Sequence, residues 1–320
     1  MRCADVLGGS DLSIAVIDKS RTPGVKPCAG GITPNTELYH ELPGKYLQFY
    51  RHRVIINRRE FDVALKHPIR VVDREELAGY QIDRINRHDN IRLFRGVSVE
   101  SISSGDGKNY VSTREGQRFG YRYLVGADGS NSVTRAFLGL EFRSRIGFNY
   151  RIRSEHDGMA WYFNPNLLGD GYCWIFPHLD FLSCGVYYDP RAIEGKEAKK
   201  ALNRFLDSRG LKYDKNELKG FPVNCSYSGY SFGNIFLCGD AAGVALPATG
   251  EGIYPAVQSG ESVGKFLLGD RSAFSAMDTL QRACRSQNRA VRLFRYMRSA
   301  FIQSFGLEVL ARLGSRYYKS

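Results

Sequence analysis

The sequence predicts an α/β protein in which a parallel-sheet domain is interrupted by an antiparallel-sheet domain, with helices at the C-terminus. Apolar strands at 12–17, 123–125 and 234–238 each end in a turn that carries Asp. In the last two turns the Asp stands next to a Gly. Residues 147–186 alternate in large aromatic side chains, which is typical of an antiparallel sheet with one ligand-facing side. We therefore predict an interrupted domain at 1–142 and 233–270 (with a substrate-domain hairpin near 45–57), an inserted domain at 143–232 and helices at 271–320.

Composition bounds the class of protein without choosing a partner. The 320 residues are 43% hydrophobic and carry a net charge of +12, which suits nucleic acid, an anionic membrane surface or a phosphorylated ligand. The basic residues are spread along the chain, and no helix-turn-helix, RNP-type or zinc pattern accompanies them, so we expect no nucleic-acid partner.

The cysteines and the apolar runs bear on the compartment. The seven cysteines include no CxxC pair, which disfavours a metal site and fits a reducing compartment. No run of about 18 apolar residues occurs, so we expect no transmembrane helix. The sequence predicts a cytoplasmic protein, with peripheral attachment to a membrane left open.

The strongest motif is the segment 234–260, NIFLCGDAAGVALPATGEGIYPAVQSG. An apolar strand delivers Gly239 and Asp240 to a turn, where the Asp carboxylate is placed to accept hydrogen bonds from ligand hydroxyls. Glycines at 250 and 252 let the backbone approach a flat ring, and the helix that follows directs its positive end there. Gly239, Asp240, Pro247, Gly250, Glu251 and Gly252 are therefore candidate cofactor-binding residues.

A second turn, 126–135 (GADGSNSVTR), also ends a strand. Asp128 and Gly129 form the turn, and Ser130 and Ser132 are candidate caps for the helix that starts at about Ser132. An ordinary strand–turn–helix explains this segment equally well when it is taken alone.

Together the two turns, in this order, resemble the FAD-dependent proteins of the p-hydroxybenzoate hydroxylase type. The resemblance implies that Asp240 binds the ribityl chain, that residues 250–252 face the flavin, and that Asp128 contacts cofactor phosphate or a nicotinamide nucleotide. Gly129 is a candidate cofactor-binding residue beside it. Arg58-x-x-Phe61-Asp62 resembles the start of a helix whose Arg contacts FAD, so we expect a helix at 59–65. Asp18, at the end of the strand 12–17, matches the acidic residue that binds the adenosine ribose.

The first strand and GxGxxG loop of a Rossmann-like FAD-binding domain do not precede Asp18. That loop and its helix supply the usual site for the pyrophosphate. A start codon assigned too late, or a relative that no longer binds the cofactor, would each explain the difference. We expect the first, because the remaining motifs are intact.

Two further motifs resemble the geranylgeranyl reductase branch of these flavoproteins. Lys26-Pro-Cys-Ala-Gly-Gly31 resembles its KxCxGG loop beside the flavin, and residues 172–177 (YCWIFP) resemble its YxWxFP signature at the prenyl pocket. The resemblance implies that Tyr172, Trp174, Phe176 and Pro177 bind substrate. Cys28 is the one candidate catalytic residue, as proton donor or at the edge of the pocket. Core packing is the competing interpretation for Cys28, Trp174 and Phe176.

The implied reaction is reduction of C=C bonds in an isoprenoid chain, with FAD as cofactor and NAD(P)H or another donor as reductant. The alternatives are a flavin-dependent monooxygenase or halogenase of aromatic substrates, and a relative without catalysis. For the halogenase W-x-W-x-I-P pattern, Tyr172 and Phe176 depart from the expected residues. Arginines recur through 282–298 beside apolar residues, which predicts either a basic helix at a membrane surface or a solvated helix face.

Overall fold

In the computed structural model, the described residues are 1–34, 40–42, 46–105, 109–155, 158–297 and 299–317. They form two compact units, and the chain alternates between them. The first unit comprises residues 1–25, 75–144 and 223–285, and the second comprises 26–74, 145–222 and 286–320. The helices predicted at 271–320 as one region are thus divided between the units.

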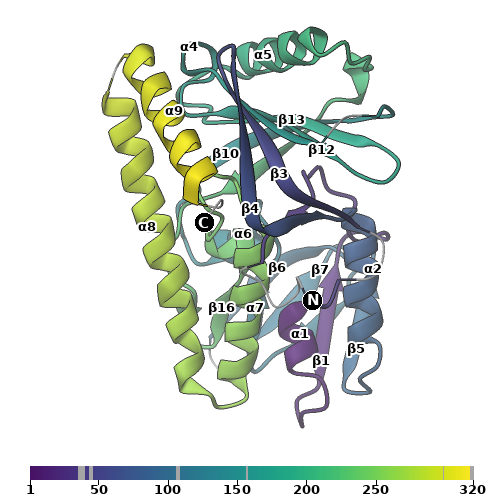
Figure 1. Cartoon of the computed structure of the whole chain (residues 1–320). Coiled ribbons are helices and arrows are strands. Elements are labelled where there is room, and N and C mark those ends of the chain that lie inside the picture. Colours follow the sequence, from purple (N-terminus) through teal and green to yellow (C-terminus); the bar gives the residue numbers. More distant parts are fainter. Residues whose placement is uncertain (35–39, 43–45, 106–108, 156–157, 298, 318–320) are drawn as a thin grey trace. The chain divides into compact units, whose positions relative to one another are not determined.

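The first unit contains three small sheets (Figure 1). Parallel pairs join β1 (Ile14–Asp18) to β5 (Ile91–Arg95), and β9 (Leu124–Gly126) to β16 (Ile235–Leu237). Its other strands are β6 (Val99–Ser103), β7 (Tyr110–Thr113), β8 (Arg118–Gly120) and β15 (Ser231–Phe232). The predicted strands at 12–17 and 234–238 are present, with boundaries shifted by one or two residues.

The helices of the first unit are α1 (Arg2–Val6), α2 (Arg74–Ile85), α3 (Val133–Phe137), α6 (Gly239–Ala242), α7 (Ile253–Leu267) and the short 3-10 helix η3 (Arg271–Ala273). Helix α1 packs closely on α7 at two glycines. A β-carbon on Gly264 would lie 2.9 Å from Val6, and one on Gly260 would lie 3.3 Å from the nitrogen of Cys3. The glycines of α7 therefore allow the two helix backbones to approach.

The second unit is built on an eight-stranded sheet of order β14-β10-β13-β12-β11-β3-β4-β2. Its interior packs Cys173, Ile175, Cys184 and Val186 against helix α5, as expected for one buried sheet face. Most neighbours are antiparallel, whereas β11 and β3 pair in parallel. The elements are β2 (Gly31–Ile32), β3 (Leu47–Ile56), β4 (Arg59–Val71), β10 (Ser144–Ile152), β11 (Met159–Phe163), α4 (Pro165–Leu168), β12 (Tyr172–Pro177), β13 (Leu182–Tyr188), α5 (Gly195–Ser208), η2 (Lys215–Glu217) and β14 (Lys219–Asn224).

The prediction of a helix at 59–65 is wrong, because these residues form the first part of strand β4. Asn57 has a φ of 56°, in the left-handed region, and so forms the turn that lets β4 fold back on β3. Phe61 then pairs with Val54 and Val63 with His52, while Arg59, Glu60 and Asp62 are exposed. This two-residue alternation favours a strand over the three- to four-residue period of a helix.

Two long helices end the chain (Figure 1). Helix α8 (Phe274–Tyr296) begins in the first unit and continues into the second, and α9 (Ala300–Tyr317) packs against β4 and β3. Within the part of the chain that the structure describes, no helix is both long enough and apolar enough to cross a membrane.

Candidate functional site

The two Gly/Asp turns lie at the same sheet edge of the first unit. Strands β9 and β16 are parallel neighbours, with Gly126 opposite Leu237, so both strands deliver their turns at their carboxyl ends. Ser130 Oγ donates a hydrogen bond to Asp240 Oδ2 over 3.0 Å. Turns that are far apart in the sequence therefore form one local site, at the position where parallel sheets usually bind ligands.

The backbone around Asp240 is held by buried polar groups. Asn224 Nδ2 donates to the carbonyl oxygen of Asp240 over 2.8 Å, and Arg135 Nη1 donates to that of Ala241 over 3.0 Å. Gly239 has a φ of 56°, and Gly243, with a φ of 73°, ends the short helix α6. These contacts provide hydrogen-bond donors for the last carbonyl oxygens of α6 and fix the backbone from which the Asp240 side chain extends.

Arg135 connects three segments of the first unit. Besides Ala241, its guanidinium donates to the carbonyl oxygens of Glu141 and Ser226 and to Ser228 Oγ. The side chain is buried, and burial lowers the pKa of its guanidinium from the ordinary value. A planar group with five donors suits this set of fixed acceptors better than an amine does.

Residues 246–252 form a closed loop ahead of α7. Leu246 N donates to the oxygen of Glu251, and Gly250 N, at a φ of 68°, donates to the oxygen of Leu246. Pro247 is buried within the loop. Gly252 is the N-cap residue of α7 and has no side chain to occupy the helix end. Its position is close to Asp240, because a β-carbon built on Gly252 would lie 3.5 Å from Asp240 Oδ1.

These residues fit a flavin cofactor. The half-buried Asp240 carboxylate provides an acceptor for ribityl hydroxyls, and the first turn of α7 contains no acidic residue that would oppose an electron-rich ring edge. Glycine at 250 and 252 leaves the approach to that helix end without β-carbons. The residues that would hold FAD here are Gly239, Asp240 and the loop from Pro247 to Gly252.

Asp128 makes local contacts in the structure. One carboxylate oxygen accepts from Ser132 Oγ over 2.6 Å, and the other accepts from the nitrogen of Thr134 over 3.0 Å. Ser132 in turn caps α3 by accepting from the nitrogen of Arg135. Gly129 follows with a φ of 79°. The Asp128 side chain thus stabilises the turn that presents Ser130, and its predicted contact with cofactor phosphate stays a prediction.

Asp18 and Arg58 occupy different places. Asp18 ends β1 in the first unit, half-buried, where its Oδ1 accepts from the nitrogen of Ser20 over 2.8 Å. Arg58 lies exposed in the β3–β4 turn, within the second unit. The predicted helix start at Arg58 is wrong, because the segment that follows it is a strand, and its predicted contact with FAD stays a prediction.

The loop around Cys28 packs on β12 and β13 of the second unit. Ser183 Oγ donates to the carbonyl oxygen of Cys28 over 3.1 Å, and His178 Nε2 lies 3.0 Å from the oxygen of Ala29. Burial lowers the pKa of His178 to about 4, so its neutral ring donates from Nε2 to that oxygen. Gly30 has a φ of 77°, and a β-carbon there would lie 2.5 Å from the oxygen of Val72. The loop therefore requires glycine at this point.

The signature strand β12 presents its aromatic side chains on the sheet face opposite α5. Cys173 and Ile175 belong to the core beneath α5, so Tyr172, Trp174 and Phe176 point to the other face. Pro177, at the end of the strand, is buried. On that face the Phe176 ring packs edge-on against Trp161 with centroids 5.0 Å apart, and a β-carbon on Gly31 would lie 2.8 Å from it. The loop 26–31 and the YCWIFP strand are thus in contact within one unit.

A buried hydroxyl links the signature strand to the Cys28 loop. Ser183 Oγ accepts from Trp174 Nε1 over 3.1 Å and from Asn149 Nδ2 over 2.5 Å, while it donates to Cys28. Gly185 leaves room for the indole, since a β-carbon there would lie 2.2 Å from the ring. Trp174 is therefore oriented by hydrogen bonding as well as by packing.

Several of these residues were absent from the sequence-based site. The sequence predicts for Ser130 only a helix cap, and it does not single out Arg135, Asn224, His178 or Ser183. The sequence contains one usable signal, because Ser183 and Gly185 alternate with apolar residues in β13 and so share a face. Nothing in the sequence pairs Ser130 with Asp240 without the strand order.

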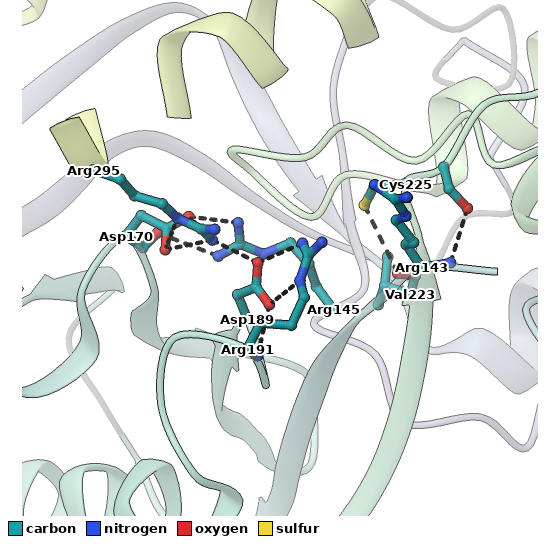
Figure 2. A network of polar contacts seen from close by, with 9 residues as sticks. Arg143, Arg145, Asp170, Asp189, Arg191, Val223, Cys225 and Arg295 are labelled. Carbon is teal, nitrogen blue, oxygen red and sulfur yellow. Dashed lines mark hydrogen bonds and ion pairs between the residues drawn. The ribbon is translucent and has the colours of Figure 1, made fainter. Parts of the chain in front are cut away.

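The arginines of α8 do not form one solvent-facing stripe. Figure 2 shows Arg295 directed at Asp170 and Asp189 of the second unit, with Arg145 and Arg191 completing the network. Both aspartates are almost fully buried. Burial opposes ionisation of Asp189, but hydrogen bonds from Arg191 and Arg295 outweigh it and hold its pKa far below the ordinary value. Arg295 therefore belongs to a buried ion-pair network, and the contact of the remaining arginines with a membrane stays a prediction.

Comparison with known proteins identifies relatives of this arrangement. The chain is 26% identical over 266 residues to the geranylgeranyl diphosphate reductase of Rhodobacter capsulatus, covering 78% of this chain and 67% of that protein. A solved structure described as geranylgeranyl bacteriochlorophyll reductase-like, from Thermoplasma acidophilum, matches 99% of this chain and 86% of its own with a TM-score of 0.72 and 17% identity. No family model matches the sequence.

A flavin-dependent halogenase also shares the fold. Its structure covers 89% of this chain and 60% of its own, with a TM-score of 0.65 and 15% identity. At that identity the likeness concerns the fold alone, and it leaves the reaction to be argued from the residues.

Proposed function

Because the chain belongs to the geranylgeranyl reductase-like family of FAD-dependent oxidoreductases, we propose that it reduces C=C bonds in isoprenoid chains. When bound and reduced, FAD supplies the two electrons that an alkene takes up, and a donor of the NAD(P)H class replenishes them. The protein's part is to bind the cofactor, orient the alkene and provide a proton.

The observation that carries the cofactor assignment is the hydrogen bond between Ser130 and Asp240. It fixes one carboxylate oxygen of Asp240, next to the glycine-capped end of α7. A carboxylate oriented in this way is ready to accept from a polyol chain without further ordering. The side chain is only half-buried, so a ligand retains access to it.

The aromatic face of the second unit supports an isoprenoid substrate. Tyr172, Trp174 and Phe176 share one sheet face with Trp161, and the Cys28 loop packs against it. Apolar area contributes about 25 cal/mol per Å2 to binding. Tyr172, Trp174 and Phe176 are only 6–8% exposed, so their proposed role is that of a buried wall behind a long hydrocarbon chain. An unactivated alkene offers little polarity to recognise, and its reduction depends on positioning.

Cys28 is the proposed proton donor or pocket-edge residue. Its backbone is fixed by Ser183 and its Sγ accepts from the nitrogen of Gly30 over 3.4 Å, so the thiol has a defined place on the loop. The side chain is half-buried, which leaves it accessible to a bound chain.

The test is direct turnover. Purified protein is loaded with FAD and reduced chemically under nitrogen, then mixed with geranylgeranyl diphosphate and with a geranylgeranyl lipid. We expect products heavier by two hydrogens per reduced bond in mass spectrometry. Protein without FAD is the control. No mass change with either compound contradicts the proposal.

A second candidate is a monooxygenase or halogenase of aromatic compounds, favoured by the shared fold of the halogenase. Such an enzyme needs polar groups that recognise an aromatic ring substituent, whereas the polar groups of the β12 face, Ser183 and Asn149, are bonded to each other and to Trp174. Oxidation or halogenation of a phenol in air by the reduced protein, without alkene reduction, would establish this alternative.

A further inference from the structure

Helix α9 is oriented with polar side chains inward and large apolar side chains outward. Among its described residues, Gln303 and Ser304 are buried, while Phe301 is 80% exposed and Phe305 is 61% exposed. Ile302 and Val309 are exposed on the same face, since 302, 305 and 309 follow helical spacing. A surface helix in water normally has the opposite orientation.

This orientation is held by specific polar contacts. Asn57 Nδ2 donates to Ser304 Oγ over 2.9 Å, and Gln303 Nε2 donates to the oxygen of Phe294 over 2.8 Å. Arg59 pairs with Glu308 over 2.8 Å. These contacts attach the polar face of α9 to the β3–β4 turn and to α8. Rotation that buried the aromatic face would break all of them.

The end of α8 carries a second exposed stripe. Arg289, Arg292, Leu293 and Tyr296 are exposed and follow the i, i+3, i+4, i+7 spacing of one helix face. Arg295 lies outside this stripe because it is engaged with Asp170 and Asp189. Glu308 is the one acidic residue in the sequence from 279 to 320, and it is 13% exposed in its ion pair with Arg59.

We propose that these two stripes form a docking face for an anionic lipid bilayer. The docking face is defined by Arg289, Arg292, Leu293, Tyr296, Phe301, Ile302, Phe305 and Val309. Aromatic and aliphatic side chains enter the region between lipid headgroups and acyl chains, and arginines pair with lipid phosphates. A second copy of the chain is disfavoured as the occupant, because a twofold contact through this face would bring its arginines together. The inference does not depend on the substrate.

Vesicle co-sedimentation of the full chain tests the proposal. Vesicles of phosphatidylcholine alone are compared with vesicles of phosphatidylcholine and phosphatidylglycerol in equal amounts. We expect binding to the anionic vesicles that weakens with salt. Arg289→Gln with Arg292→Gln should weaken it about 30-fold, from about 1 kcal/mol for each cation near the surface. Phe301→Ser with Phe305→Ser should reduce binding to the same vesicles.

Matched controls lie elsewhere in the same unit. Lys196→Gln with Arg204→Gln removes two exposed cations from α5, and Leu179→Ser removes an exposed apolar side chain from the β12–β13 turn. Both controls should bind vesicles like the parent. The arginine pair is exposed, so its variant keeps the test valid even where the phenylalanine variant folds poorly.

Two outcomes would overturn the proposal. One is vesicle binding that is absent in the parent or equal in the parent and the arginine variant. The other is concentration-dependent self-association that the phenylalanine variant abolishes, without vesicle binding, which would make the face a contact between copies.

Discussion

The Ser130 hydroxyl donates to the Asp240 carboxylate across 110 positions of the sequence, over 3.0 Å. Each residue belongs to a different turn, and the parallel pairing of β9 with β16 brings the turns together. The bond holds the Oδ2 atom of Asp240. The Oδ1 atom lies next to Gly252, the N-cap residue of α7. One hydroxyl therefore sets the orientation of the proposed cofactor acceptor.

Asp240→Ala should weaken FAD binding about tenfold to a hundredfold, because a hydrogen bond to a charged group contributes about 1.5–3 kcal/mol. Ser130→Ala should give a smaller loss in the same direction, since it releases the carboxylate without removing it. Isothermal titration with FAD measures both. Asp11→Ala, at an exposed position of the same unit, is the control. Equal affinity in Asp240→Ala and the parent would refute the assignment of Asp240.

Arg135→Lys should lower the free energy of unfolding by about 2–4 kcal/mol. An amine cannot reach the separated oxygens of Glu141, Ser226 and Ala241 together, and buried carbonyls without donors are costly. Urea unfolding followed by circular dichroism gives the change. Arg114→Lys, at an exposed site, should leave the midpoint unchanged.

Cys28→Ala should abolish or strongly reduce alkene reduction while FAD binding is retained, because the substitution leaves the proposed cofactor-holding residues Gly239, Asp240 and the loop 247–252 unchanged. The loop should keep its place, since Ser183 bonds the backbone oxygen and not the thiol. Cys225→Ala, which alters another half-buried thiol, is the matched control. Full turnover in Cys28→Ala would exclude a chemical role for the thiol.

Acidification should destabilise the protein between about pH 6.5 and pH 4. Burial lowers the pKa of His178 and of His52 to about 4, so the unfolded chain binds protons in this range while the folded chain does not. Their contribution to stability is complete above the unfolded pKa and is lost as the pH falls toward the folded value, by up to about 1.4 kcal/mol per pH unit for each ring.

Urea midpoints across that pH range provide the measurement. His178→Gln keeps a donor for the oxygen of Ala29 and should flatten the pH dependence, whereas His67→Gln, at an exposed site, should not. A slope that is the same in all three proteins would show that His178 is not the group responsible.

Local patterns predicted the strands that carry Asp18 and Asp240, the cap of α3 at Ser132 and the helix after Gly252. Each depends on a continuous segment in which periodicity and turn residues agree. The β3–β4 hairpin was not predicted. The motif at Arg58 resembles a helix start, and this resemblance was given more weight than the alternation of apolar residues at Phe61 and Val63, which indicates a strand. The turn at Asn57 is visible only when that alternation is followed.

Contacts between distant segments were beyond the sequence. The regular spacing of arginines in 282–298 predicts a helix face, but it does not say which member meets Asp170 and Asp189. In the same way, the YCWIFP pattern predicts that successive side chains point to opposite faces of the sheet. It does not indicate that Ser183 is hydrogen-bonded to both Trp174 and Cys28. Such relations follow from strand order, which a single sequence does not contain.

The alternation of the chain between its two units also constrains how the protein folds. Each unit is assembled from three separate segments, so neither is complete until the segment 223–285 or 286–320 has been synthesised. During synthesis, the segments 26–74 and 145–222 of the second unit therefore emerge before the first unit has its last segment, 223–285. Contacts of such long sequence separation make folding slow and leave sheet edges exposed to chaperones and to aggregation. We expect low yields from rapid expression at high temperature, and better recovery when synthesis is slowed.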